Sequence, residues 1–371
     1  MTLTLHPAKL SGEIAAMPSK SDLHRLMIAA WLAGQDISQL PIISEDIAAT
    51  RDCLLATDGV LNCRESGSTL RFLLPVMAAL GRTVTFTGEG RLPERPLEPL
   101  LSLLRQHGVT INGETLPLRI SGQLQPGTYQ LPGNISSQYI TGLLFALPLL
   151  QQDSEIILTS PLESAGYVEM TLRTLGKFCA FVEKSQIGWV LQNWSYRPAA
   201  TLVPEGDWSN AAFWLAAGLN VVGLDENSAQ PDKEIVQLLQ LGGDMDASQC
   251  PDLVPIMAVY AAVNYERCEI RNAARLRIKE SDRLAAMAQN LAALGADVTE
   301  LPDGMVIRGK KPLRGGVEVN SFGDHRIAMA MAIAALYCDA PVTLHGAEVV
   351  AKSYPNFWAD YQRLGGIVHG L

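Results

Sequence analysis

The sequence predicts an α/β protein of two domains, in which buried helices occupy the middle and sheets lie outside. Three observations predict this class. The chain has 371 residues, 48% hydrophobic and 18% charged, which is long enough for about two domains with real cores. A polar turn leading into an apolar helix occurs six times, as in an internal repeat. Amphipathic helices and strand-like runs fill the intervals between these copies.

The repeated unit starts with a small polar turn and continues into a helix rich in Ala, Leu and Met. Because each such helix is apolar nearly all the way round, we expect it to be buried on every side. The turns begin at Pro18, Glu65, Gly133, Gly206, Pro251 and Gly323.

A second helix follows each copy, and most end in Gly followed by a β-branched residue. Glycine supplies the left-handed turn after a helix, and β-branched residues favour strands. The clearest second helices span 96–108, 234–242, 281–295 and 355–366, whereas those ending near Gly59 and Gly176 fit less well. Strands are expected at 83–87, 155–158, 187–191, 268–270 and 342–344.

Charge, hydropathy and cysteine spacing exclude several classes of function. The net charge of −9 disfavours nucleic acid as a partner, because binding it needs a basic face. The longest apolar runs, 142–150 and 327–338, are shorter than the roughly 20 residues of a membrane span. Six scattered cysteines without a CxxC pair predict reduced thiols in a cytoplasmic protein. Neither GxSxG nor GxxxxGK[ST] appears, which disfavours a serine hydrolase and a P-loop NTPase.

The polar turns are the candidate chemical sites. Unpaired backbone N–H groups and the positive end of the helix dipole favour anions at a helix N-terminus. Several cations lie at or near these turns, and together they predict an electropositive cleft that holds phosphate and carboxylate groups. The cations are Lys20, Arg25, Arg71, Arg95, Lys279, Arg283, Arg326 and Lys352.

Several other polar residues of these turns also have a purely structural interpretation. Ser136, Asp252 and Asp324 could be helix N-caps, and for Asp324 the cap is the favoured interpretation. His325 is more often a buried, hydrogen-bonded histidine than a base, and Glu280 could serve the helix dipole. Recurrence at similar positions of a repeat favours the functional interpretation, because independent structural roles do not readily produce it.

The motifs of these turns resemble those of the 5-enolpyruvylshikimate-3-phosphate synthases, in the order of that family and over residues 18–355. Lys-Glu-Ser-Asp-Arg and Asp-His-Arg are the most specific of them. The matching segments are Pro18-Ser-Lys-Ser-Asp-Leu-His-Arg25, Ser66-Gly-Ser-Thr-Leu-Arg71, Glu94-Arg-Pro96, Ser136-Ser-Gln138, Pro251-Asp252, Arg277-Ile-Lys-Glu-Ser-Asp-Arg283, Asp324-His-Arg326 and Ala351-Lys-Ser-Tyr-Pro355.

The resemblance implies a fold of two inside-out α/β barrel domains, each of three βαβαββ repeats, with the active site in the cleft between them. The expected N-terminal domain spans 14–204, and the expected C-terminal domain combines 1–13 with 205–371. A hinge is placed near the Pro-Glu-Gly break at 204–206. The halves are expected to close around the substrate.

The resemblance also implies a reaction and a set of site residues. The enolpyruvyl group of phosphoenolpyruvate passes to the 5-hydroxyl of shikimate 3-phosphate, through a tetrahedral ketal and with release of phosphate. Lys20, Ser21, Arg25, Ser136, Ser137, Ser164, Asp252 and Lys279 are expected to contact shikimate 3-phosphate. Lys20, Gly67, Arg95, Gln138, Arg283, Arg326 and Lys352 are expected to contact phosphoenolpyruvate.

Asp252 is the base that the resemblance implies, and Lys20 and Glu280 are the other proton-transfer groups. Our hypothesis for Glu280 is that burial keeps it more neutral, so that it donates a proton to carbon. The resemblance implies no metal or organic cofactor, because Arg and Lys supply the electrostatic stabilisation. A monomer is expected on the same ground.

Three departures from the family pattern stand near the expected site. Glu65 occupies a position that is often Asn, and we expect Arg64, Arg71 or Arg95 to neutralise it. Glu45 replaces a frequent Asp, and Arg275 stands where many members have Asn, so Arg275 is left out of the site. The chain is also short for the family, which predicts trimmed loops.

Two rival functions remain on the same scaffold. UDP-N-acetylglucosamine enolpyruvyl transferase would show Lys-Asn in place of Lys20-Ser21 and a catalytic Cys on a mobile loop, whereas segment 91–95 has no Cys. An inactive anion-binding paralogue is disfavoured by the presence of Lys20, Asp252, Glu280 and Lys352.

Overall fold

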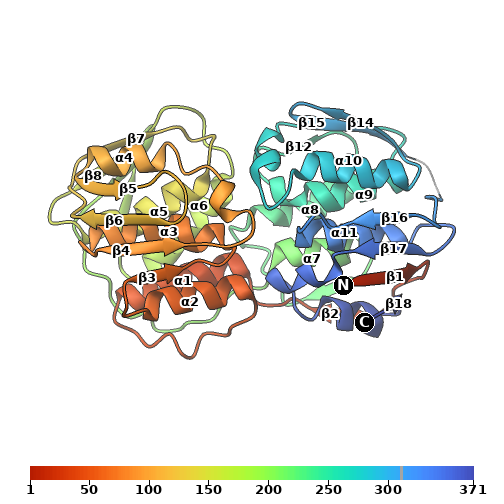
Figure 1. The fold of residues 1–371 in the computed structure, drawn as a ribbon, viewed down its shortest axis with the longest axis horizontal. Helices are drawn as coiled ribbons and strands as arrows, with labels where there is room; N and C mark the ends of the chain where they lie inside the picture. Colours follow the sequence, from red (N-terminus) through yellow and green to blue (C-terminus); the bar gives the residue numbers. More distant parts are fainter. Residues whose placement is uncertain (310–311) are drawn as a thin grey trace. The chain divides into compact units, whose positions relative to one another are not determined.

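The chain folds into two compact bodies in the computed structural model, which describes residues 1–309 and 312–371. The N-terminal body is Lys20–Pro204, and the C-terminal body combines Met1–Ser19 with Glu205–Leu371. Each body has its own hydrophobic core. Figure 1 shows both chain termini in the C-terminal body.

The first crossing between the bodies lies between residues 19 and 20, not near the expected residue 14. Strand β2 (Glu13–Ala15) pairs in parallel with β11 (Asn220–Val222), and Ser19 N donates to Glu205 O at 2.7 Å. These backbone bonds hold residues 14–19 to the C-terminal body. The return crossing lies between Pro204 and Glu205.

The six repeated helices form where the sequence predicts them, and all are largely buried. In the last of them, every residue from His325 to Ala335 is buried, as its all-round apolar surface requires. Within the bodies, α3 packs on α5 and α9 packs on α11 (Figure 1). The six are α1 (Lys20–Leu32), α3 (Gly67–Ala79), α5 (Ser137–Ala146), α7 (Trp208–Ala216), α9 (Val254–Asn264) and α11 (His325–Ala335).

A second helix follows each buried one, and short 3-10 turns precede or extend several of them. The second helices are α2 (Glu45–Leu55), α4 (Leu100–Gln106), α6 (Ala165–Lys177), α8 (Ile235–Leu241), α10 (Arg283–Ala293) and α12 (Phe357–Arg363). The 3-10 turns are η1 (Leu92–Glu94), η2 (Leu147–Leu149), η3 (Pro231–Glu234), η4 (Pro251–Leu253), η5 (Ala274–Ile278) and η6 (Ala347–Lys352).

Four sheets share one topology, in which a parallel pair is extended by two antiparallel strands. Their orders are β3-β4-β6-β5, β7-β8-β10-β9, β12-β13-β15-β14 and β16-β17-β1-β18. The first two comprise β3 (Val60–Asn62), β4 (Val84–Thr87), β5 (Val109–Asn112), β6 (Leu118–Gly122), β7 (Thr128–Leu131), β8 (Ser154–Leu158), β9 (Val182–Lys184) and β10 (Gly188–Leu191). The others comprise β12 (Met245–Asp246), β13 (Cys268–Arg271), β14 (Asp297–Leu301), β15 (Gly304–Arg308), β16 (Glu318–Asn320), β17 (Val342–His345), β18 (Ile367–His369) and β1 (Thr2–His6).

The start of the chain completes the sheet formed by its end. Strand β1 lies between β17 and β18 and is antiparallel to both, with Leu5 opposite Val342 and Val368. Leu3 and Leu5 are fully buried and alternate with more exposed residues, as one face of a strand requires. The C-terminal body therefore closes its last repeat with the first residues of the chain.

The remaining two units are incomplete, so the expected three full repeats per domain are not present in the described chain. The unit of α7 has only the β11–β2 pair, and the unit of α1 and α2 has no strand among the described residues. Chain length explains both cases. Only 242–244 separate α8 from β12, and only 56–59 separate α2 from β3, too few residues for a hairpin.

Candidate active site

Lys20 is the first residue of α1, directly after the Pro18-Ser19 turn. Its Nζ donates to Asp46 Oδ2 at 2.7 Å, and the two side chains are 16% and 15% exposed. Asp46 lies in the first turn of α2, where a carboxylate is favoured by the helix dipole. Asp46 lies outside every motif that resembles the family, so the sequence alone did not indicate it.

Arg25 is buried and ties α1 to α6. Its Nε donates to Thr171 Oγ1 at 2.9 Å, and its Nη atoms donate to the carbonyl oxygens of Ser21 and Tyr167. Burial lowers the pKa of Arg25 to about 10, although Asp22 and Tyr167 oppose this shift. The structure thus gives Arg25 a helix-clamping role in addition to the ligand contact expected from the resemblance.

Gly67 begins α3, and two arginines lie against it. An added Cβ would stand 2.5 Å from Arg71 Nη1 and 2.8 Å from Arg95 Nη1, distances that real Cβ atoms do not show. Ser66 caps the same helix by accepting from Thr69 N. The absence of a side chain at Gly67 therefore has a structural reason, because it leaves room for two buried guanidinium groups.

Arg64 does not have Glu65 as its ion-pair partner. Its Nη2 contacts Asp52 Oδ2 at 2.8 Å, and Arg71 Nη2 donates to Pro96 O at 3.0 Å. The Glu65 carboxyl group lies against Gly90, where an added Cβ would meet it at 2.5 Å.

The start of α5 brings three of the expected residues together. Ser136 caps the helix by accepting from Gln138 N, and Ser137 is buried as its first residue. Gln138 Nε2 donates to Ser68 Oγ at 3.0 Å, which joins the N-termini of α5 and α3.

Ser164 precedes α6 in a left-handed conformation, with φ 54° and ψ 42°. It is also buried, at 2% exposure. A non-glycine residue in this region is strained by about 1–2 kcal/mol. Such strain at a buried polar residue makes Ser164 a candidate functional residue, and its contact with shikimate 3-phosphate stays a prediction.

Arg283 is the centre of a buried charge cluster in the C-terminal body. It starts α10 with a side chain only 2% exposed, and three carboxylates surround it: Asp324 at 2.7 Å, Asp252 at 2.8 Å and Glu280 at 3.0 Å. Burial alone would lower the pKa of Arg283. The carboxylates, Asp324 first, outweigh burial and raise that pKa well above its usual range.

Asp252 lies in η4, between cations from three segments. Arg326 Nη2 is 3.0 Å from Oδ2, and Arg283 Nη1 and Lys279 Nζ are 2.8 and 3.9 Å from Oδ1. Burial would raise the pKa of Asp252, but Arg326, Lys279 and Arg283 outweigh it and hold that pKa well below its usual range. Asp252 is therefore an ionised carboxylate whose basicity is suppressed by its neighbours.

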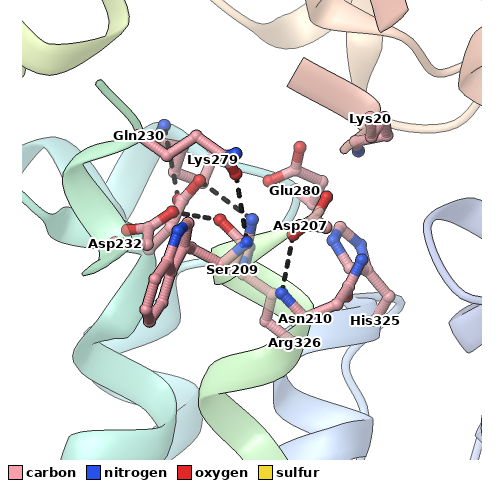
Figure 2. Close-up of polar contacts among 12 residues, drawn as sticks. Lys20, Asp207, Ser209, Asn210, Gln230, Asp232, Lys279, Glu280, His325 and Arg326 are labelled. Carbon is pink, nitrogen blue, oxygen red and sulfur yellow. Dashed lines mark hydrogen bonds and ion pairs between the residues drawn. The ribbon is translucent and has the colours of Figure 1, made fainter. Parts of the chain in front are cut away.

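Glu280 is largely buried, and it forms an ion pair with Arg283. Its side chain is 20% exposed and accepts from Arg283 Nη2. Figure 2 shows Glu280 among polar groups that include Lys279. The hypothesis that burial keeps Glu280 more neutral stays a prediction, and the structure adds that its carboxylate accepts from a guanidinium.

Asp324 is the N-cap of α11, as favoured from the sequence, and accepts from Arg326 N at 2.9 Å. The same carboxylate accepts from Arg283 Nε and from Ser281 Oγ. Sequence reasoning found the cap but missed this second role. His325 is buried beside it, and Lys352 ends η6, which packs on α11.

A further polar network lies at the start of α7, in the repeated turn that begins at Gly206 (Figure 2), although none of its residues was assigned to a substrate from the sequence. Asp207 caps α7, and the Ser209 hydroxyl donates to Asp232. Gln230 accepts from Ser19 Oγ and Trp208 N, both at 3.1 Å. Through Ser19, this network holds the last residue of the C-terminal body before the chain crosses to Lys20.

Comparison of the chain with models of protein families identifies the family to which it belongs. The model of the family described as EPSP synthase (3-phosphoshikimate 1-carboxyvinyltransferase) matches residues 47–240 and 225–361. The chain belongs to this family.

Curated relatives support the same assignment over nearly the whole chain. A 3-phosphoshikimate 1-carboxyvinyltransferase of Clostridium acetobutylicum is 43% identical, covering 98% of this chain and 97% of the relative. One of Clostridium kluyveri is 41% identical with the same coverage. The alignment with the first relative runs over 418 positions, more than the 371 residues of this EPSP synthase family member. The relative therefore carries insertions that this chain lacks.

Solved structures show the same fold. An EPSP synthase from Acinetobacter baumannii superposes with a TM-score of 0.80 at 24% identity, covering all of both chains. The enolpyruvyl transferase NikO from Streptomyces tendae gives 0.72 at 17% identity, covering 99% of this chain and 98% of the other. Both comparisons support a mixed α/β fold of the EPSP synthase kind.

Two negative findings apply to the part of this EPSP synthase family member that the structure describes. There, no cluster of three or more His, Cys, Asp or Glu side chains is arranged to hold a metal ion. Within the same residues, no helix combines the length and apolarity needed to cross a bilayer.

Proposed function

We propose that this chain transfers the enolpyruvyl group of phosphoenolpyruvate to the 5-hydroxyl of shikimate 3-phosphate and releases phosphate. The observation that carries the proposal is the buried cluster in which Arg283, Arg326 and Lys279 surround Asp252, in a chain of the EPSP synthase family. Converging cations suit a doubly anionic donor, and a carboxylate among them suits a base for a hydroxyl.

Residues of both bodies are assigned to the two substrates. Shikimate 3-phosphate is assigned to Lys20, Ser21, Arg25, Ser136, Ser137, Ser164, Asp252 and Lys279. Phosphoenolpyruvate is assigned to Lys20, Gly67, Arg95, Gln138, Arg283, Arg326 and Lys352. The Ser68–Gln138 bond and the guanidinium groups beside Gly67 support the assignments at α3 and α5.

The reaction has an addition and an elimination. In the addition, the 5-hydroxyl oxygen bonds to C2 of phosphoenolpyruvate, its proton passes to Asp252, and the methylene carbon gains a proton from Lys20 or Glu280. In the elimination, the C2–O bond to phosphate breaks and the new methyl group returns a proton. Atoms balance, because the acceptor loses one hydrogen and phosphate leaves protonated.

Substrate binding explains how Asp252 becomes an effective base. In the structure, its charge is neutralised by Arg326, Arg283 and Lys279. An anionic donor that binds Arg326 and Arg283 partly neutralises the positive charge that stabilises the Asp252 anion. The basicity of Asp252 therefore rises when the donor binds. The proposal places the base under the control of the donor.

The electrostatic work is assigned to side chains, and the proposal needs no metal or organic cofactor. Arginine and lysine groups aimed at developing charge stabilise a transition state without reorganisation. Glu280 stays in the proposal as a proton-transfer group, now in contact with Arg283. Its proton is exchanged within a charged network and not in an apolar pocket.

The fold and the setting of the enzyme are part of the proposal. Buried helices with four-stranded sheets of one topology support two inside-out α/β barrels, in which two of six repeats are trimmed. A monomer acting in the cytoplasm on small-molecule substrates is proposed. The six cysteines, all free in the structure, support a reducing compartment.

The test is phosphate release from phosphoenolpyruvate with shikimate 3-phosphate and UDP-N-acetylglucosamine supplied as separate acceptors. We expect release with shikimate 3-phosphate alone, and a product heavier than the acceptor by one enolpyruvyl group. Release with the nucleotide sugar alone would assign the chain to the sister reaction. Release with neither, from folded protein, would identify an inactive paralogue.

A further inference from the structure

The ion pair between Asp46 and Lys20 holds the end of a flexible side chain that the proposed reaction uses. Lysine has a long stem with several rotatable bonds, so its ammonium group needs a partner to stay in one place. The 2.7 Å contact from Nζ to Asp46 Oδ2 is a charge-assisted hydrogen bond, stronger than a neutral one. Both groups are largely screened from solvent, at 16% and 15% exposure.

Asp46 is itself held by a chain of buried hydroxyl groups. Thr50 Oγ1 and Thr69 Oγ1 lie 2.6 Å apart, and both contact the backbone carbonyl of Asp46, at 3.4 and 3.5 Å. Thr69 Oγ1 also donates to Ser66 Oγ at 2.7 Å. Because Ser66 caps α3, this chain joins the start of α2 to the start of the helix that carries Gly67.

The hydroxyl chain ends at a histidine of α1. His24 Nδ1 lies 2.8 Å from Thr50 Oγ1, with both side chains buried. Burial lowers the pKa of His24 to about 3, a shift that Asp46 opposes and that Lys20 and Arg25 reinforce. The ring is therefore neutral over the working range of an enzyme, and the support of Asp46 does not change charge there.

We propose that Asp46 is a positioning residue for Lys20, which aims the ammonium group while the hydroxyl chain fixes Asp46 between α1 and α3. The inference rests on the role of Lys20 in the proposed function. A misplacement of about 1 Å in a reacting group can cost about 100-fold in rate. Because the pair is largely buried, the loss of one partner can also destabilise the fold. The effect on turnover is therefore measured on variants whose folding is confirmed by their Tm.

The experiment compares Asp46→Asn and Asp46→Glu with a control on the same helix. Asp52→Asn is the control, because Asp52 lies on α2 with a side chain 44% exposed and pairs with Arg51 and Arg64. Asp46→Asn should lower kcat about 10- to 100-fold, with the KM for shikimate 3-phosphate within about threefold of wild type. Asp46→Glu should recover part of kcat, and Asp52→Asn should leave it unchanged.

A double-mutant cycle separates positioning from a general structural role. If Asp46 acts through Lys20, Asp46→Asn should have no further effect on the residual kcat of Lys20→Ala, measured as product by mass spectrometry. The same fold loss in both backgrounds, or an Asp46→Asn kcat within twofold of wild type, would overturn the inference. Wild-type protein that releases no phosphate would instead overturn the proposed function, so the two failures are distinct.

Discussion

Single residues set the charge state of the C-terminal cluster. Arg283 is buried against three carboxylates, and Asp252 is shared by three cations. Burying an unpaired ion costs several kcal/mol, so each member of such a cluster depends on the others. The same pairing that stabilises Asp252 as an anion also suppresses it as a base, which is why we couple its basicity to the arrival of the donor.

Asp252 should make the fold sensitive to acid. Its pKa in the folded protein lies below the unfolded value of about 3.9, so its ionised form stabilises the fold above that pH. The contribution is lost as pH falls through the folded pKa. We expect Asp252→Asn to be less stable than wild type at pH 6, with the gap in Tm narrowing between about pH 4 and pH 2. Melting curves whose separation stays constant over that range would contradict the assignment.

Gly67 offers a test of the guanidinium groups beside it. In Gly67→Ala, the new Cβ displaces the ends of Arg71 and Arg95, so we expect the KM for phosphoenolpyruvate to rise about tenfold, or ~1.4 kcal/mol. Gly176→Ala is the matched control, because Gly176 lies in α6 and an added Cβ there would stand in open space. If steady-state kinetics show an unchanged KM for phosphoenolpyruvate in Gly67→Ala, these arginines do not bind the donor.

At this scale the motifs indicated the identity of the site residues but not their partners. Lys20, Asp252 and Arg283 are written in short segments of sequence. Their neighbours Asp46 and Asp324 lie 26 and 41 residues away along the chain, so only folding brings them close. The contact between Glu280 and Arg283 was not predictable for a related reason, because it depends on how the segment 277–283 turns.

Helix N-termini are the elements that carry the site. Ser66, Ser136 and Asp324 each cap a buried helix with a side-chain oxygen, which satisfies backbone donors that are otherwise unpaired. Expected ligand-binding residues stand within the first turns of these helices. Because the helices are buried along their length, the polar turns are fixed relative to the core of their own body.

Two substitutions of Ser164, the residue before α6, distinguish an effect of backbone strain from an effect of substrate contact. Ser164→Gly removes both the strain and the hydroxyl group. We therefore expect the free energy of unfolding to rise by about 1 kcal/mol, seen as a higher Tm, together with a higher KM for shikimate 3-phosphate. Ser164→Ala keeps the strain and should raise KM without raising Tm. An unchanged KM in both variants would show that the hydroxyl does not contact the substrate.

The helices were predictable from the sequence, and the sheets only in part. All-round apolar surfaces identify the buried helices, and Gly followed by a β-branched residue identifies strands such as β5 and β18. A sixfold repeat then suggested six equal units, although two are trimmed. The spacing along the chain explains this difference. The connecting segments 242–244, between α8 and β12, and 56–59, between α2 and β3, are too short to form the missing hairpins.

At the scale of the whole molecule, the chain crosses twice between two bodies, and its first strand belongs to the body formed by its last residues. Leu5→Ala should therefore destabilise the C-terminal body, by about 2–5 kcal/mol, and leave the N-terminal body protected. Hydrogen exchange read by mass spectrometry resolves the two bodies. Thr4→Ala, on the other face of β1, is the control. Equal loss of protection in both bodies would contradict independent cores.

In the proposed function, polar clusters in both bodies serve one transfer reaction, and kinetics of one variant from each body test this. Phosphate release from phosphoenolpyruvate with shikimate 3-phosphate is compared for wild type, Lys20→Ala and Asp252→Ala, with folding checked by circular dichroism. The first substitution alters the N-terminal body and the second the C-terminal body. We predict that wild type releases phosphate and that each folded variant loses at least about 100-fold in kcat. Release within a few-fold of wild type in either variant would show that the cluster of that body takes no part in the reaction.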